Sequence, residues 1–200
     1  MPGKCCLLLA VWAVTVGPMG FFDDMPYRDP YGRRRGGRWD LPVNEFPSAV
    51  VTGPLMFART EEVAVAVIGV WAFQTGFEFW LDARFRHAQP PVEGGMAPQE
   101  AVHVGVQFAD GRKDANFGRG PERAEGAALT GVALNPGGFG GGLRHRNWSY
   151  WVSPLPPAGP VTFVCEWAAA GIPETRASLD AQLIVDAARR SVRLWPEDGG

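Results

Sequence analysis

The residues that could bind a metal ion or act as acid–base groups are few and do not cluster in the sequence. They are three histidines and three cysteines, at His87, His103, His145, Cys5, Cys6 and Cys165. Metal sites need several such ligands at short spacing, and no Cys-x-x-Cys pair or Cys/His cluster occurs here. We therefore expect no metal site, no cofactor and no disulfide framework. We interpret the histidines as exposed and Cys165 as a small buried apolar residue.

Carboxylates supply the second chemistry to consider, because glycoside hydrolysis uses two carboxyl groups about 5–10 Å apart. Glu78, Asp82 and Glu166 lie on or next to segments that have the pattern of strands. The outward positions of a half-buried strand are ordinarily polar, so we interpret all three as part of the polar faces of those strands and expect no catalytic residue. A hydrolase-like enzyme that uses these sheet carboxylates is the alternative.

A glycine-rich stretch, NPGGFGGGLRHR at 135–146, has some likeness to a phosphate-binding loop. A P-loop also needs a lysine followed by serine or threonine, and a helix must come after it. Neither requirement is met, because the pattern of a strand follows instead. Glycine tolerates many backbone conformations, so we predict a flexible loop within a long connection over residues 118–146.

Tryptophans are the feature that points to binding. Trp80, Trp151 and Trp167 lie on or at the end of expected strands, and Trp148 adjoins the glycine-rich stretch. Aromatic side chains on one face of a sheet could bind sugars, peptides or another protein by stacking and apolar contact. The simpler interpretation, which we favour, is that another part of the chain covers them, because large exposed apolar patches are rare on monomers.

The candidate ligand-binding surface combines the end of the glycine-rich stretch with the strand that follows it. Its residues are Arg144, His145, Trp148, Tyr150 and Trp151.

The elements that must position these residues are strands. Apolar side chains alternate with polar ones over 76–86, and residues 63–73 form a β-branched apolar run, so the two segments predict a hairpin. Residues 102–108 and 112–117 predict a second hairpin, because Asp110-Gly111 between them suits a tight turn. Further strands are expected at 147–153, 161–167 and 174–179.

The end of the chain has the signals of a short helix over residues 181–190. Asp180 precedes it as a capping residue, and apolar residues follow at helical spacing. Together these patterns predict an all-β fold, an antiparallel β-sandwich of about seven or eight strands with a short C-terminal helix.

Length and charge are those of a single globular domain. The chain has 200 residues, 46% of them hydrophobic, and a formal net charge of -2. A balanced charge gives no overall attraction to nucleic acid or to anionic lipid. We assign residues 47–197 to one β-sandwich domain.

The first 46 residues divide into two parts. Residues 1–18 are apolar, and the run CCLLLAVWAVTV over residues 5–16 is either a signal or anchor, a folded segment, or sequence upstream of a true start at Met19. A start at Met19 predicts a cytoplasmic protein, and a true signal or anchor predicts an exported or membrane-associated one. Residues 19–46 combine arginines and aromatic residues with acidic residues, so we interpret them as a disordered arm and expect no specific nucleic-acid binding.

Several short motifs stand out in the body of the chain. They are YWVSPLPPAGPVTFVCEW at 150–167, preceded by the glycine-rich stretch, and GFEF, FADGR, GIPET and LWPE at 76–79, 108–112, 171–175 and 194–197. This set of motifs is similar to that of an uncharacterised actinobacterial protein family. The resemblance covers residues 47–197. It implies a small β-rich domain and brings no activity, cofactor or site residue.

The residues favour a non-enzymatic binding or interaction module. Its partner would be a protein or a glycan, and a membrane enters only if residues 5–16 are a true signal or anchor. Neither the motifs nor their spacing identifies the ligand.

Overall fold

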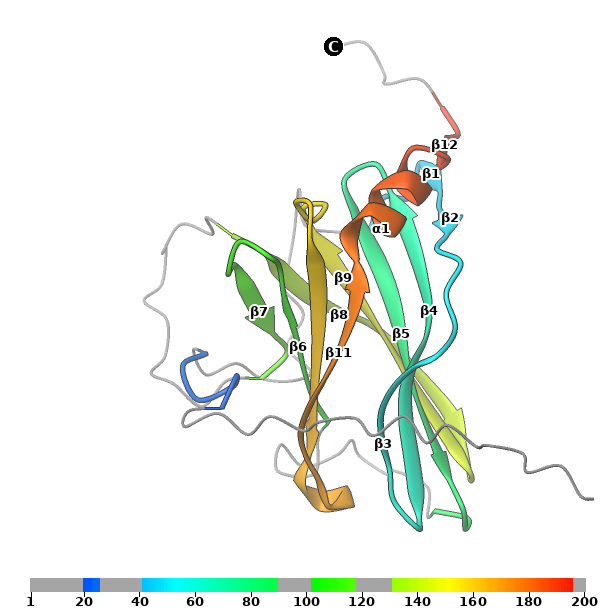
Figure 1. Ribbon diagram of the computed structural model, residues 1–200. Helices are drawn as coiled ribbons and strands as arrows, with labels where there is room; N and C mark the ends of the chain where they lie inside the picture. The colour runs from blue at the N-terminus through cyan, green and yellow to red at the C-terminus, as the bar shows by residue number, and fades with distance from the viewer. Residues whose placement is uncertain (1–19, 26–40, 90–101, 118–130, 196–200) are drawn as a thin grey trace, which may run out of the picture.

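Two antiparallel sheets, a short two-stranded ribbon and one short helix make up the computed structural model (Figure 1). It describes residues 20–25, 41–89, 102–117 and 131–195. In this part of the chain, eight strands have five or more residues, and every strand pair is antiparallel. The predicted all-β fold with seven or eight strands and a C-terminal helix is therefore confirmed.

The larger sheet has six strands in the order β2-β4-β5-β9-β8, with β3 also paired to β4. The predicted hairpin between the apolar run and the alternating strand is its centre, formed by β4 and β5. The bounds are β2 (Ser48–Ala49), β3 (Leu55–Arg59), β4 (Val63–Phe73), β5 (Gly76–Phe85), β8 (Ala133–Gly142) and β9 (His145–Ser153).

The smaller sheet has four strands in the order β11-β10-β6-β7. Its bounds are β6 (His103–Gln107), β7 (Lys113–Ala115), β10 (Pro160–Trp167) and β11 (Ile172–Asp180), and the 3-10 turn η2 (Ala168–Ala170) joins the last two. The predicted hairpin of β6 and β7 turns at Asp110-Gly111, where Gly111 has a φ of +86° that favours glycine.

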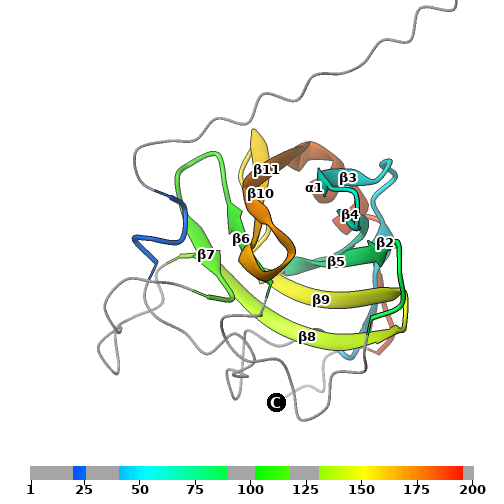
Figure 2. The same ribbon diagram turned by 90° about the horizontal axis from the view of Figure 1, so that it is seen from below.

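The two sheets face each other across one hydrophobic core. Aromatic rings from both sheets meet there, with Phe163 of β10 at 4.9 Å from Phe79 and 6.3 Å from Phe77 of β5. At the edges, β3 lies beside β11 and β7 beside β8, so the strands nearly enclose the core when seen end-on (Figure 2). Each strand therefore has an inner face in the core and an outer face.

The helix α1 (Ala181–Ala188) begins where the sequence predicts it. The Asp180 carboxylate accepts a hydrogen bond of 2.9 Å from the Gln182 amide, and Ile184 is fully buried in the core. The ribbon of β1 (Glu45–Phe46) and β12 (Val192–Arg193) lies beside this helix at one end of the molecule (Figure 1).

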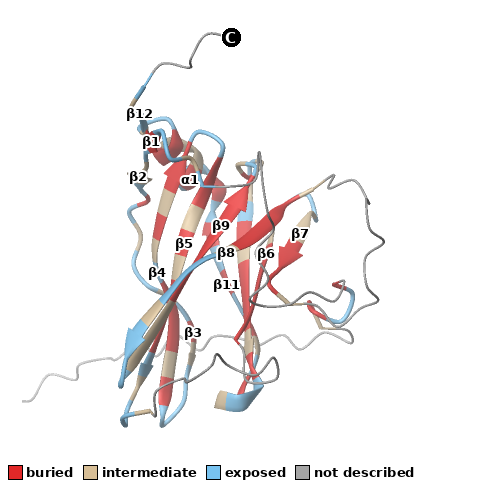
Figure 3. Cartoon of the chain, turned by 180° about the vertical axis from the view of Figure 1, so that it is seen from behind, coloured by how far each residue is buried: buried red, intermediate tan, exposed pale blue. Residues whose placement is uncertain are grey.

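The glycine-rich stretch is a strand, so the prediction of a flexible loop is wrong over residues 133–142. These residues form β8, whose backbone pairs with β9 and whose last part is largely exposed (Figure 3). Glycine is accommodated because side chains of β9 lean against it. A Cβ on Gly140 would lie 2.9 Å from Asn147 Oδ1, and one on Gly137 would overlap Ser149 Oγ.

Part of the expected N-terminal arm lies on the folded body. Gly20–Met25 forms a turn that packs on the outer face of the smaller sheet, as the blue segment in Figure 1 shows. Residues 1–19 and 26–40 lie outside the described residues, and so does the apolar run at 5–16. No helix in the described ranges is long and apolar enough to cross a membrane.

Candidate functional site

The five predicted ligand-binding residues do not form one surface. Trp148 and Tyr150 point into the core with 5% and 2% of their surface exposed. Trp148 lies edge-on to Trp167 at 5.8 Å, and Tyr150 stacks on Phe79 at 5.3 Å. Successive side chains of a strand point to opposite faces, so these two face away from Trp151.

The remaining three predicted residues lie on other parts of β9 and its turn. Trp151 is on the outer face of the larger sheet, where its ring meets Phe73 at 5.3 Å and is buried. Arg144 and His145 lie at the β8–β9 turn, and Arg144 donates to the backbone oxygens of Phe85 and Arg86. Arg144 therefore fastens the ends of two hairpins together.

His103 is buried, so the expectation that it is an exposed residue is wrong. It lies on the outer face of the smaller sheet with 7% of its surface exposed, and its ring stacks on Phe117 at 4.0 Å. Its Nδ1 is 3.3 Å from Glu166 Oε2 on the neighbouring strand. The Gly20–Met25 turn covers the same face, which a reading of strand alternation alone does not reveal.

The three candidate catalytic carboxylates do not converge. Glu166 lies on the outer face of the smaller sheet, whereas Glu78 and Asp82 lie on the outer face of the larger one, with the core between them. Glu78 and Asp82 are four residues apart on β5, which separates their Cα atoms by ~13 Å. Asp82 is buried and paired with Arg84, so the structure does not assemble a pair for hydrolysis from these residues.

No group of three or more potential metal ligands occurs among the described residues. Cys165 is fully buried on the inner face of β10. Burial raises the pKa of its thiol, and the neighbouring Glu166 carboxylate acts in the same direction. Cys165 is therefore unsuited to act as a nucleophile at neutral pH.

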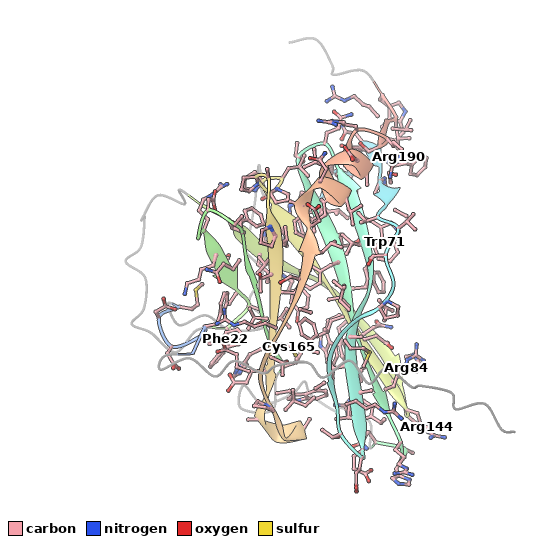
Figure 4. All side chains as sticks on the ribbon, viewed as in Figure 1. Phe22, Trp71, Arg84, Arg144, Cys165 and Arg190 are labelled. Atoms are coloured by element: carbon pink, nitrogen blue, oxygen red, sulfur yellow. The ribbon has the colours of Figure 1, made fainter. Side chains whose placement is uncertain are left out.

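An open cavity of about 720 Å³ lies at the β3–β4 turn, near the end of the sheet where Figure 4 labels Arg84 and Arg144. Its lining combines three arginines with two glutamates, and Arg84 is already paired with Asp82. The charges nearly cancel, so this cavity has no strong preference for anions or cations. The lining residues are Arg59, Thr60, Glu61, Glu62, Val63, Ala64, Arg84 and Arg86.

A better candidate lies higher on the outer face of the larger sheet, and we call it the tryptophan–glutamate face. It consists of Trp71, Glu78, Trp80 and Trp151. Trp71 of β4 and Trp151 of β9 stand directly opposite Glu78 of β5, one on each side, and Trp80 is two residues further along β5. Directly opposite residues have Cβ atoms about 4.5–5.5 Å apart, so three indoles surround the base of one carboxylate.

Two glycines make room for the indoles of this face. A Cβ on Gly69 would lie 2.7 Å from Cζ3 of Trp71, and a Cβ on Gly76 would lie 2.8 Å from Cη2 of Trp151. Each ring therefore occupies the space that a side chain at the glycine would need. Trp71 also meets Trp80 at a centroid distance of 6.0 Å and an angle of 68°, which fixes both rings; Figure 4 labels Trp71 on this side of the sheet.

The carboxylate of this face has no partner in the part of the chain that is described. Glu78 is half-buried and makes no hydrogen bond or ion pair there. Its Oε1 lies 3.6 Å from the point that a Cβ on Gly137 would occupy, so the side chain leans across β9 toward β8. The indole nitrogen of Trp151, buried on the next strand, also lacks a hydrogen-bond partner in the described ranges.

The sequence contains one signal for this face. Trp80 is the single large apolar residue among the polar positions of β5. The outward position of Trp71, and its place beside the Glu78 carboxylate, cannot be predicted without knowing how β4 pairs with β5.

The comparisons with known proteins identify no relative. No family model matches the chain, no curated protein matches it, and no solved structure matches its fold. The functional proposal therefore depends on the geometry of the chain itself.

Proposed function

We propose that this protein is a non-enzymatic binding module and that the tryptophan–glutamate face binds a neutral, hydroxyl-rich ligand, a carbohydrate. The observation that carries the proposal is the Glu78 carboxylate, half-buried between indoles and without a partner among the described residues. Partial removal of a charged acceptor from water is costly unless a donor replaces the lost water. A sugar hydroxyl is such a donor.

The tryptophans supply the apolar half of the proposed site. Trp71 and Trp80 are half-buried, so each still presents part of its ring. The C–H groups of a sugar ring pack favourably on an indole, while its hydroxyl groups reach polar neighbours. A ligand that stacks on Trp80 would therefore bring hydroxyl groups within reach of Glu78.

Charge narrows the ligand class. The other carboxylate on this side of β5, Asp82, is paired with Arg84, so Glu78 is the uncompensated charge of the face. A negatively charged ligand would be repelled by Glu78, because two charges of the same sign brought close together destabilise a complex. The proposal is therefore for a neutral carbohydrate and against an acidic one.

The experiment is a titration followed by tryptophan fluorescence and calorimetry. The probes are neutral hexasaccharides of glucose, xylose and N-acetylglucosamine, with oligogalacturonate as the anionic comparison and tetramethylammonium as the cationic one. We expect saturable binding of at least one neutral hexasaccharide. Glu78→Gln should weaken it by roughly 10- to 100-fold, because a hydrogen bond to a charged group contributes about 1.5–3 kcal/mol.

Matched controls separate this site from general effects. Trp80→Ala should weaken binding as strongly as Glu78→Gln, whereas Glu61→Gln, at an exposed residue of the turn at the opposite end of β4 from Trp71, should leave it unchanged. Binding of only the anionic or cationic probe would contradict the proposal. So would a folded Glu78→Gln variant that binds as the parent chain does.

A further inference from the structure

The Gly20–Met25 turn is a compact ligand-like segment seated on the outer face of the smaller sheet. Phe21 and Phe22 are 2% and 0% exposed, and Met25 is also buried. They form a hydrophobic cluster with Ala115 and Val164 that is separate from the main core. We call their seat the docking groove and define it by the sheet residues that contact the turn: Gly105, Lys113, Ala115, Val164 and Glu174.

The shape of the groove fits two adjacent aromatic rings. A Cβ on Gly105 would lie 2.7 Å from Cζ of Phe21, so the ring of Phe21 fills the space that a side chain would need. Phe22 lies edge-on to Phe21 at 5.1 Å and to His103 at 5.7 Å. The absence of a side chain at one position of β6 thus creates the seat for the first ring.

Polar contacts fix the direction and register of the turn. The backbone N–H of Phe21 donates to Glu174 Oε2 at 2.5 Å, and Arg176 holds the same carboxylate through its other oxygen at 2.8 Å. At the far end, the Lys113 ammonium is 2.7 Å from both carboxylate oxygens of Asp24. The Glu174 carboxylate of the groove therefore binds the backbone of the turn, and the Lys113 ammonium binds an acidic side chain of the turn.

Cations also flank the first ring. Lys113 Nζ lies 5.0 Å and Arg176 Cζ 5.9 Å from the centroid of Phe21, within the range of a cation–π attraction. Basic groups on both sides of an apolar seat complement an aromatic segment followed by acidic residues. Gly20-Phe21-Phe22-Asp23-Asp24 has that chemistry.

These contacts are those of a bound linear peptide, with two aromatic anchors, one backbone hydrogen bond and one charge pair within six consecutive residues. We propose that the docking groove is a peptide-binding site and that Gly20–Met25 is its tethered ligand. The partner it fits is another protein that presents two adjacent phenylalanines followed by a carboxylate. The groove lies on the opposite sheet from the tryptophan–glutamate face, so this proposal is independent of the carbohydrate site.

The covalent connection of Gly20–Met25 to the rest of the chain sets the conditions under which another protein can bind the groove. A segment that belongs to the same chain as its binding site acts at a high effective concentration. An external segment must therefore compete with Gly20–Met25, and weakening the tethered anchors should expose the groove.

The experiment measures fluorescence anisotropy of a labelled, N-acetylated hexapeptide with the sequence of residues 20–25. The full chain carries Phe21→Ala and Phe22→Ala, which removes the tethered anchors and leaves every groove residue in place. We expect saturable binding at least ten-fold tighter than to the parent chain, where the tether competes. Added Lys113→Glu should reduce it at least ten-fold, whereas Arg190→Glu, a charge reversal just after the end of α1 and far from Phe22 (Figure 4), should not.

A second measurement uses the parent chain and does not depend on the folding of any variant. Excess hexapeptide should displace the Gly20–Met25 turn from the docking groove. Hydrogen exchange at the backbone amide of Phe21, which otherwise donates a hydrogen bond to Glu174, should then become faster. A peptide in which both phenylalanines are alanine should have no effect.

Three results would overturn the proposal. They are a folded double variant without saturable binding, equal binding by its Lys113→Glu form, and exchange at Phe21 that the hexapeptide does not change. The parent chain could also form a concentration-dependent dimer that the hexapeptide dissociates. That result would overturn the proposal that the partner is another protein, because a second copy of this chain would then occupy the groove.

Discussion

At the scale of the residue, burial decides what the single described thiol can do. Cys165 lies among the inner side chains of β10, fully buried, beside the partly buried carboxylate of Glu166. Both influences raise the pKa of the thiol. The folded chain therefore keeps Cys165 protonated where an unfolded chain would not, and this difference makes stability depend on pH.

This difference gives a prediction with a definite sign. When folding raises the pKa of an acid, the free energy of unfolding is unaffected by that acid at pH values below its unfolded pKa, which is about 8.5 for cysteine. Above that pH the unfolded chain loses the proton and the folded chain does not, so the free energy of unfolding falls as the pH rises. Between pH 7.5 and 9.5 the parent chain should lose about 1.4 kcal/mol more of its free energy of unfolding than Cys165→Ala does. Urea unfolding at both pH values measures this, and parallel losses would contradict it.

At the scale of the element, one β-bulge decides which side chains form the candidate site. Val63, Val65 and Val67 point inward on β4, and strict alternation would place Gly69 and Trp71 with them. The pairing of β4 with β5 shifts at Ile68, between Val67 and Gly69, so that Val70 and Ala72 point inward instead. A bulge adds one residue to one strand and reverses the alternation beyond it.

Sequence therefore predicts the hairpins better than the site. The β6–β7 hairpin is predictable because Asp110-Gly111 and the flanking alternation are local signals. Trp71 depends on a bulge, which the alternation of an apolar run does not reveal. The burial of His103 depends on its contact with Phe22, which lies about 80 residues earlier in the chain. No local pattern of the sequence specifies that contact.

The glycines of β8 give a prediction at this scale. Gly137→Ala should lower the free energy of unfolding by about 1–3 kcal/mol, because the new Cβ would overlap Ser149 Oγ in a packed site. Gly53→Ala, where nothing lies within 4 Å, should be neutral or slightly stabilising. Urea unfolding compares the two. If the overlap is the cause, Ser149→Gly should recover part of the loss in the double variant; no recovery would assign the loss to another cause.

At the scale of the whole molecule, the described residues bury two hydrophobic clusters with different roles. The main core joins both sheets and α1, and rings such as Phe163 and Phe77 meet across it. The smaller cluster joins the Gly20–Met25 turn to the outer face of one sheet. We therefore expect loss of the first cluster to separate the sheets and loss of the second to release only the turn.

This separation predicts different costs for two buried phenylalanines. Phe163→Ala should lower the global free energy of unfolding by about 3–5 kcal/mol, as expected for a large cavity in a core. Phe22→Ala should cost less, because the loss cannot exceed the free energy of docking: beyond that point the turn detaches and the sheets remain folded. Hydrogen exchange should show the difference, with Phe22→Ala speeding exchange at the Phe21 amide and not in β5 or β10. Equal acceleration in all three would mean that the turn and the sheets unfold as one unit, which would also weaken the case for an exchangeable ligand in the docking groove.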